Sequence, residues 1–234
     1  SILFIFNLRG VKIVLARNGN ETKIAWSFWG AFGFLAILVG LNADVIQNID
    51  NIVFNSLVRI DNPSLTAMFK IVALLASPAV SVLIIVIFSG WLYLNHQRTL
   101  GLLALTTLLG GDTLALGFKY LVHRARPVQP LVTDSGYSFP SGHVFGTILL
   151  VTILLAIGLP FITSSCKRVS LIGLGVVWIL IVMISRVYLR DHYASDTIGS
   201  WLLACGCWYQ AKAWYGRWRC HVQDYLMHLS HRHF

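Results

Sequence analysis

Residues 144–162 read VFGTILLVTILLAIGLPFI, and no charged side chain interrupts this run. A helix of about 20 predominantly apolar residues crosses the hydrocarbon core of a bilayer, so the run predicts a transmembrane helix. Five further apolar stretches lie on either side of it, at residues 24–41, 65–94, 100–121, 169–184 and 198–211. Pro78 should divide one of them into a short outer piece and a span. The sequence therefore predicts an all-α polytopic membrane protein, with six transmembrane helices in a bundle.

The composition supports this class and disfavours others. Hydrophobic residues make up 56% of the 234 residues and charged residues 12%, and the mean hydropathy is +0.71. A typical soluble domain is about 25% charged, so a soluble enzyme and a disordered tail both fit poorly. The net charge of +9 does not indicate nucleic-acid binding, because the basic residues lie between apolar runs rather than in one stripe or tail. We expect one membrane-embedded domain over residues 1–234, surrounded by the lipid bilayer and without a protein partner.

The segment between the first two spans, residues 42–62, is mixed in character and includes three acids. Its apolar residues recur at helical spacing, at Val45, Ile46, Ile49, Val53, Phe54 and Leu57. This pattern is typical of an amphipathic helix that lies on a membrane surface. We therefore expect a short interfacial helix region between the first and second transmembrane helices.

The orientation in the membrane follows from the distribution of Lys and Arg. In this arrangement of spans, eleven of the 18 basic residues fall on one side of the membrane and seven on the other. Cytoplasmic segments carry the excess of positive charge. The side with eleven is therefore expected to be cytoplasmic, together with both termini of a multi-pass protein of the cell membrane.

Ionisable residues gather at the outer ends of the third to sixth spans, on the expected extracytoplasmic side. They are Lys119, Arg124, Arg126, His143, Arg186, Arg190, His192 and Asp196. Ionisable groups at membrane depth are costly and mark function, and five cations with two histidines at one face indicate an anion site. The spacing of Lys119 and Arg126, two helical turns, predicts that both face one point from a helix that Pro127 ends.

A helix start directly precedes the run 144–162. Residues 140–143 read PSGH, and Ser141 is a plausible N-cap. The free N–H groups at a helix N-terminus bind phosphate oxygens well. The backbone of Ser141 and Gly142 is therefore a candidate phosphate ligand, although Ser141 fits a purely structural cap equally well.

A histidine and a carboxylate are paired by spacing near residue 190. His192 and Asp196 are four residues apart, so on a helix the carboxylate reaches one ring nitrogen and leaves the other free. The roles of the neighbouring charges stay open. Arg124 and Arg190 fit headgroup binding or solvation of a loop, and Asp191 is interpreted as offsetting Arg190.

Three motifs together resemble the signatures of a known family. They are Lys119-x6-Arg126-Pro127, Pro140-Ser141-Gly142-His143 and Ser185-Arg186-x5-His192-x3-Asp196. They match, in order, the signatures of the type 2 phosphatidic acid phosphatase family, and the compact layout with short loops is similar to its bacterial members. The signatures occupy 119–127, 140–143 and 185–196, and the expected spans extend the likeness over most of the chain. The resemblance implies a six-helix membrane bundle that removes phosphate from lipid phosphates without a metal ion or other cofactor.

The chemistry and the resemblance give each residue a role. Three side chains would neutralise the phosphate: Lys119, Arg126 and Arg186. Two backbone N–H groups would complete the cradle, those of Ser141 and Gly142. His192, held by Asp196, would attack phosphorus, which the resemblance also implies, and a phosphohistidine would form. His143 would protonate the departing lipid alkoxide and then activate water.

Two other functions draw on the same features. A phosphohistidine can pass its phosphate to another lipid instead of water, which would make the chain a phosphotransferase. A transporter with an anion site would also gather cations, but this cluster is one-sided, and the pair of His192 and Asp196 would have no purpose in a pore. We therefore expect a lipid phosphatase that acts at the extracytoplasmic face. Phosphatidylglycerol phosphate, undecaprenyl diphosphate and related lipid phosphates all fit as substrates.

Overall fold

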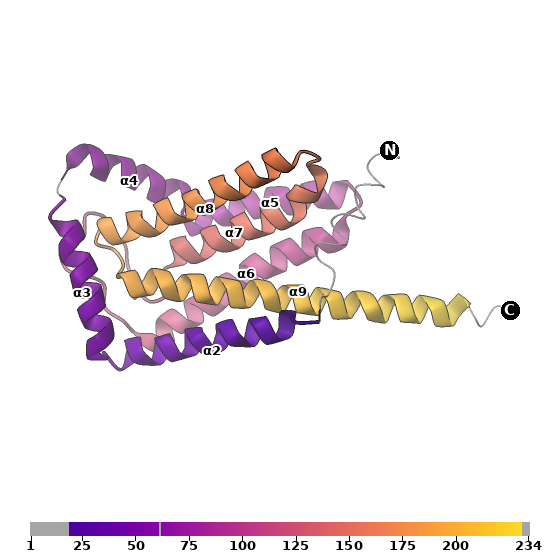
Figure 1. The fold of residues 1–234 in the computed structure, drawn as a ribbon, viewed down its shortest axis with the longest axis horizontal. Helices are drawn as coiled ribbons and strands as arrows, with labels where there is room; N and C mark the ends of the chain where they lie inside the picture. Colours follow the sequence, from indigo (N-terminus) through magenta and orange to yellow (C-terminus); the bar gives the residue numbers. More distant parts are fainter. Residues whose placement is uncertain (1–18, 61, 231–234) are drawn as a thin grey trace.

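The computed structural model describes residues 19–60 and 62–230, with side chains up to residue 218. Throughout these ranges the regular secondary structure is helical, as predicted, and most helices run roughly along one long axis (Figure 1). The helices are α2 (Glu21–Gly40), α3 (Asp44–Val58), α4 (Pro63–Leu75), α5 (Pro78–Leu94), α6 (Arg98–Val122), α7 (Gly142–Gly158), the 3-10 helix η1 (Leu159–Phe161), α8 (Ser165–Tyr188) and α9 (Ala194–Ser230).

Most of the predicted spans form helices at the expected positions. Four helical segments are long and apolar enough to cross a membrane, namely Glu21–Gly40, Arg98–Val122, Gly142–Phe161 and Ser165–Tyr188. The pair α4 and α5, bent by 41°, makes a fifth if it is one span. The predicted interruption at Pro78 is confirmed, since α5 begins there, and the hydroxyl of Ser77 caps it by accepting the Val80 N–H at 3.3 Å.

The sixth predicted span, residues 198–211, is part of a longer helix. α9 continues to Ser230, well past the predicted end, and its C-terminal part extends beyond the other helices (Figure 1). It is not among the helices apolar enough to count as spans, because small and polar residues such as Ser200 and Gln210 lower its hydropathy. Length and composition therefore do not confirm the count of six spans.

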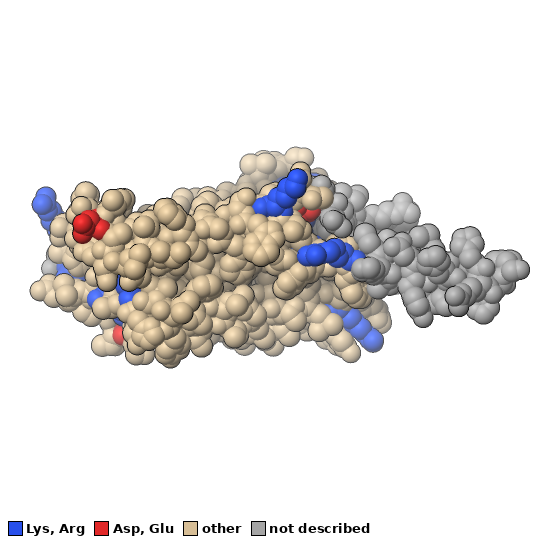
Figure 2. Space-filling view, turned by 90° about the horizontal axis from the view of Figure 1, so that it is seen from below, with Lys and Arg blue, Asp and Glu red and all other residues tan. Residues whose placement is uncertain are grey.

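The outer surface of the bundle is apolar over most of its length. On the face in Figure 2, the Lys and Arg side chains lie mainly toward the two ends, with a broad uncharged region between them. On α8, Val169 is 69% exposed and Leu174 is 65% exposed. Water would disfavour so large an apolar surface, whereas lipid chains accommodate it. The surface therefore fits a protein that lies within a bilayer.

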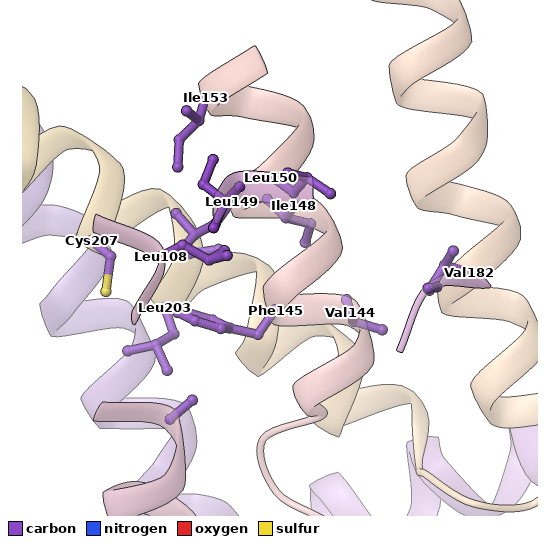
Figure 3. Close-up of a cluster of buried hydrophobic side chains, with 14 of the residues drawn as sticks. Leu108, Val144, Phe145, Ile148, Leu149, Leu150, Ile153, Val182, Leu203 and Cys207 are labelled. Atoms are coloured by element: carbon purple, nitrogen blue, oxygen red, sulfur yellow. The ribbon is translucent and has the colours of Figure 1, made fainter. Parts of the chain in front are cut away.

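α7 lies at the centre of the bundle and contacts α5, α6, α8 and α9. Figure 3 shows its side chains packed against Leu108 of α6 and Leu203 of α9. Phe145, Leu149 and Ile153 are completely buried. A helix that is apolar all round belongs in such a central position. This packing fixes the N-terminus of α7 at one end of the bundle, where the charged loops also lie.

α3 crosses that same end of the bundle (Figure 1). It forms the predicted amphipathic helix between the first two spans. Its outer side exposes both apolar and polar residues, with Val45 and Ile52 each 67% exposed and Asn48 exposed between them, and its inner face packs on the bundle through Ile46. Asp50 also lies on the inner face and is only 1% exposed. α3 therefore brings a buried carboxylate to the end of the bundle that carries the charged loops.

Candidate active site

A cavity of about 360 Å³ lies at the end of the bundle that α3 crosses. Five of the eight predicted site residues line it: Lys119, Arg126, Gly142, His143 and His192. The other three are buried and contact or adjoin residues of the cavity wall: Ser141, Arg186 and Asp196. The fold therefore brings together residues that the sequence places up to 77 positions apart.

A larger cavity, of about 550 Å³, lies between α2, α6 and α9. Its walls are apolar and aromatic, and none of its lining residues carries a formal charge. Recognition of a phosphate relies on charged and N–H donors. The smaller, charged cavity is therefore the candidate active site.

α6 ends earlier than the sequence predicts. Its last residue is Val122, and His123 adopts a left-handed conformation, with φ of 54°, that closes the helix in place of Pro127. Arg126 therefore lies in the loop after α6. The prediction that Lys119 and Arg126 share one helix face is wrong, although both side chains reach the cavity.

The loop after α6 folds back over the two cations. Lys119 Nζ donates to the carbonyl oxygen of Tyr137 at 2.7 Å. Arg126 donates from Nε to the carbonyl of Gly136 and from Nη2 to the carbonyl of Ser135, both at 3.0 Å. A carbonyl oxygen is neutral, whereas a phosphate oxygen adds the attraction of its negative charge to such a hydrogen bond. These N–H groups can therefore transfer from the loop carbonyls to a phosphate that enters the cavity.

Asp191 is the central acceptor in this network. Its buried carboxylate lies 2.6 Å from Arg126 Nη1 and 3.2 Å from His192 Nε2, and it forms an ion pair with Arg186. Burial alone would raise the pKa of Asp191, but the hydrogen bond to His192 and the charges of His192, Arg186 and Arg126 hold it well below its usual range. The interpretation of Asp191 as a counter-ion for Arg190 is therefore wrong.

Arg186 is only 2% exposed, although it carries a full charge. Besides its ion pair with Asp191, its Nη2 lies 3.3 Å from Asp134 Oδ2. The same Asp134 oxygen lies 3.6 Å from Arg126 Nη2. Two arginines therefore face two carboxylates, and a phosphate must compete with those carboxylates for the same donors. Asp134 belongs to none of the signatures, and only the folded loop reveals its place.

His192 lies in the turn before α9, rather than on the helix as predicted. Its Nδ1 is 3.5 Å from Asp196 Oδ2, close enough for an ion pair but not aligned for a hydrogen bond. The same Asp196 oxygen accepts the N–H of Tyr193 at 2.8 Å, which fixes the carboxylate in the first turn of α9. The predicted proximity of His192 and Asp196 therefore holds, but the pair spans the start of a helix.

Ser141 occupies the predicted N-cap position of α7. Its side chain makes no capping hydrogen bond, and its buried Oγ has no partner. Its carbonyl accepts the hydroxyl of Ser200 at 3.0 Å, which ties the start of α7 to α9. Gly142 and His143 follow directly and line the cavity. The first N–H groups of α7 lack intrahelical partners, as at any helix start, so they are available to an anion.

Two residues outside the predicted site complete its charge network. Arg124 donates from Nη1 to Asp196 Oδ1 and from Nη2 to Asp50 Oδ2, both at 2.6 Å. Arg124 is therefore a partner of buried carboxylates, a role that the sequence analysis did not offer. Asp50 shares a face of α3 with Ile46 and Val53. An acid within an apolar helical face is the sequence signal that could have identified it.

The chemical capacity of the cavity follows from its donors. Side-chain cations, the start of a helix and two imidazole rings surround one space. Within the described part of the chain, no three His, Cys, Asp or Glu side chains are placed to hold a metal ion together. The residues present suit an anion with several oxygen atoms, such as a phosphate group.

Comparisons with known proteins identify the family. The model of the PAP2 superfamily matches residues 99–220, more than half of the chain. A Bacillus subtilis protein named phosphatidylglycerophosphatase B is 30% identical over 174 residues, which cover 73% of this chain and 85% of that protein. The chain belongs to the PAP2 superfamily.

Two further similarities support this assignment. The phosphatidylglycerophosphatase B of Haemophilus influenzae is 40% identical over 74 residues, 30% of each protein. The crystal structure of a transmembrane PAP2-type phosphatidylglycerolphosphate phosphatase from Bacillus subtilis matches with a TM-score of 0.72 and 26% identity, over 83% of this chain and 96% of that one. This PAP2 protein is therefore a membrane-embedded enzyme of the phosphatase class, and the resemblance drawn from the three signatures is confirmed.

Proposed function

We propose that this PAP2 protein removes phosphate from a lipid phosphate at the membrane surface, through a phosphohistidine formed on His192. One observation carries the proposal: Lys119, Arg126, His143 and His192 line a single cavity at the end of an apolar bundle. The relatives named phosphatidylglycerophosphatase B favour phosphatidylglycerol phosphate as the substrate. Undecaprenyl diphosphate presents similar headgroup chemistry and is the second candidate.

The phosphate would bind by taking over donors that the protein now uses internally. Lys119 and Arg126 would turn from the loop carbonyls to phosphate oxygens, and the N–H groups at the start of α7 would add neutral donors. Arg126 and Arg186 would exchange part of their contact with Asp191 for contact with the substrate. Charge-assisted contacts of this kind also stabilise the transition state of phosphoryl transfer, in which charge spreads over the equatorial oxygens.

The first chemical step would be an in-line attack by His192 Nε2 on phosphorus. Nδ1 faces Asp196, so Nε2 is the nitrogen on the cavity side, where it now contacts Asp191. The N–P bond forms while the P–O bond to the lipid breaks, and the electron pair leaves on the lipid oxygen. A protonated His143 donates its proton to that alkoxide. The adjacent phosphate dianion favours this protonated form of His143.

The second step would release the phosphate. His143, now neutral, accepts a proton from a water molecule whose oxygen attacks the phosphorus. The N–P bond breaks, and its electron pair returns to Nε2 of His192. Inorganic phosphate leaves, and both histidines recover their starting protonation states.

The walls of the cavity support a lipid rather than a soluble phosphate ester. Pro78 at the start of α5 and two residues of α6, Leu116 and Tyr120, line the cavity beside the cations. Leu116 is 52% exposed and Tyr120 is 61% exposed on the outer surface of the bundle. An acyl or prenyl chain in the bilayer can therefore lie against α5 and α6 while its phosphate reaches the cavity.

We further propose that α9 completes a six-span arrangement and that the site faces the extracytoplasmic side. The proposal for α9 is supported by its position alongside α2 and α7. The proposal for the sidedness rests on the excess of Lys and Arg at the opposite end of the spans. Both termini would then be cytoplasmic. A membrane-impermeant thiol reagent applied to a single-cysteine variant at exposed Asn51 of α3 tests this, since it should label intact cells.

The central experiment measures phosphate release by purified protein in detergent, with EDTA present, from a panel of lipid phosphates and diphosphates. The variant His192→Asn removes the nucleophile, and His96→Asn is the matched control. His96 is exposed, lies outside the residues that line the candidate site, and has a positive φ of 61° that asparagine tolerates. We expect turnover to disappear in His192→Asn and to persist in His96→Asn.

Each outcome of that experiment is informative. Full activity of His192→Asn would refute the phosphohistidine mechanism, and strong inhibition by EDTA would refute metal independence. Substrate consumption without an equal release of free phosphate would indicate phosphate transfer to another lipid. A wild-type protein that hydrolyses none of the lipids would refute the proposed activity.

A further inference from the structure

The buried carboxylate of Asp50 lies outside the part of the chain that the PAP2 family model matches. The PAP2 match begins at residue 99, and Asp50 is on α3, between the first two predicted spans. It is only 1% exposed although it carries a charge. A buried charge is costly unless it is paired and hydrogen-bonded, so its partners show what it does.

The first partner is Arg124, which bridges two carboxylates. Its Nη2 donates to Asp50 Oδ2 and its Nη1 donates to Asp196 Oδ1, both at 2.6 Å. Burial alone would lower the pKa of Arg124, but the carboxylates of Asp196 and Asp50 raise it above its usual range. Only a guanidinium offers such a planar fork of donors. Arg124 is thereby locked between α3 and the carboxylate that faces His192.

The second partner is the start of α9. Asp50 Oδ1 accepts the Ser195 N–H at 2.9 Å, and Oδ2 accepts the Ser195 hydroxyl at 2.6 Å. Ser195 is the second residue of α9, where the N–H groups lack intrahelical partners. A carboxylate from α3 therefore caps the helix whose first turn carries Asp196 and which begins two residues after His192.

We propose that Asp50 is a positioning residue of the phosphatase reaction. It acts through Arg124 and the first turn of α9, and together these fix Asp196 against the ring of His192. The inference rests on the proposed role of His192 as the nucleophile. Asp50 does not line the cavity, so its effect falls on the chemical step rather than on substrate binding.

This arrangement also links the membrane surface to the site. The side of α3 away from Asp50 exposes Val45 and Ile52, together with the polar Asn48. These side chains suit the interface of a bilayer, as the sequence pattern predicts. α3 therefore lies between this outer side and the ion pairs that join Asp50 through Arg124 to Asp196.

The test compares Asp50→Asn with Asp44→Asn. Both substitutions remove one carboxylate charge from α3, but Asp44 is exposed and forms no ion pair with any described residue of the site. Asparagine at position 50 can still accept the Ser195 N–H, so the helix cap survives while the charged bridge to Arg124 is lost. A displacement of about 1 Å in a catalytic group can lower the rate about 100-fold. We expect kcat of Asp50→Asn to fall tenfold to 100-fold, with KM and vanadate inhibition within threefold of wild type, and Asp44→Asn to match wild type.

A second comparison tests the route through Arg124. Lysine at position 124 keeps the charge but cannot bridge two carboxylates as a fork does. In a chain that already carries Arg124→Lys, Asp50→Asn should lower kcat by less than threefold more. A full additional tenfold loss would overturn the inference that Asp50 acts through Arg124.

Other results would overturn the inference as a whole. If Asp50→Asn only lowers the midpoint of thermal unfolding and leaves kcat per folded molecule unchanged, Asp50 is structural. If KM rises as much as kcat falls, the change has loosened the site generally. Failure of the proposed function is recognised separately, because the wild type would then release no phosphate or His192→Asn would remain active.

Discussion

Asp191→Asn should make the phosphatase bind phosphate-like anions more tightly. It should also lower the thermal stability of the protein without ligand. In the structure, the Asp191 carboxylate forms ion pairs with both Arg126 and Arg186. It therefore occupies donors that a substrate phosphate needs. Asparagine has nearly the same shape but no charge, so it leaves both guanidinium groups in place with less competition for their N–H groups.

The size of the effect follows from the geometry. Two unit charges about 4 Å apart interact with about 4 kcal/mol at an effective dielectric constant of about 20. Asp134 remains near both arginines in the variant, at 3.3 Å from Arg186 Nη2 and 3.6 Å from Arg126 Nη2. Its carboxylate therefore still competes with the anion for these N–H groups. If about a third of this competition is relieved, anion binding gains about 1.4 kcal/mol, a factor of ten in Kd.

The assay is thermal unfolding in detergent over a series of vanadate concentrations, since vanadate mimics phosphate. Without vanadate, the variant should unfold at a lower temperature than wild type, because removing one member of a buried ion pair costs about 3–5 kcal/mol. With saturating vanadate, the gap should narrow, because a ligand stabilises the folded state in proportion to the logarithm of its concentration over Kd. An equal or weaker vanadate affinity in Asp191→Asn would show that Asp191 organises the arginines rather than competing with the anion.

Two further predictions follow from particular contacts. A methyl group at Gly199 would overlap the ring of Phe139, which directly precedes the 140–143 motif. Gly199→Ala should therefore lower both the thermal midpoint and kcat. Gly173→Ala on α8, where the added Cβ meets nothing within 4 Å, should lower neither. Acid should lower the stability of the folded protein through Asp191, because the pKa of this carboxyl is depressed in the folded state. The resulting stabilisation is complete above the pKa of about 3.9 that an aspartate has in the unfolded chain. It is lost progressively as the pH falls below about 3.9. Denaturation between pH 6 and pH 3 should therefore show wild type losing part of its stability advantage over Asp191→Asn. A constant difference in stability over that range would contradict the assignment.

The sequence alone determined the class of the protein and eight residues of the candidate site. Apolar runs of about 20 residues give membrane helices because the bilayer leaves no alternative partner for backbone N–H and C=O groups. The three signatures identified the family and eight residues that the fold does bring to one end of the bundle. The start of α7 at Gly142 and the interruption at Pro78 also followed from local chemistry.

Only the tertiary structure decided where α6 ends, which acids pair with which cations, and what α3 contributes. The left-handed turn at His123, rather than Pro127, places Arg126 in a loop that folds over the cavity. Ion pairs between Arg124 and Asp50, 74 positions apart, depend on how helices pack. The local sequence pattern indicates which side of a helix is buried, because residues three or four positions apart lie on the same face. The pattern does not indicate which distant charged residue will pair with a residue of that helix, because the ion pair forms only when the helices pack into the bundle.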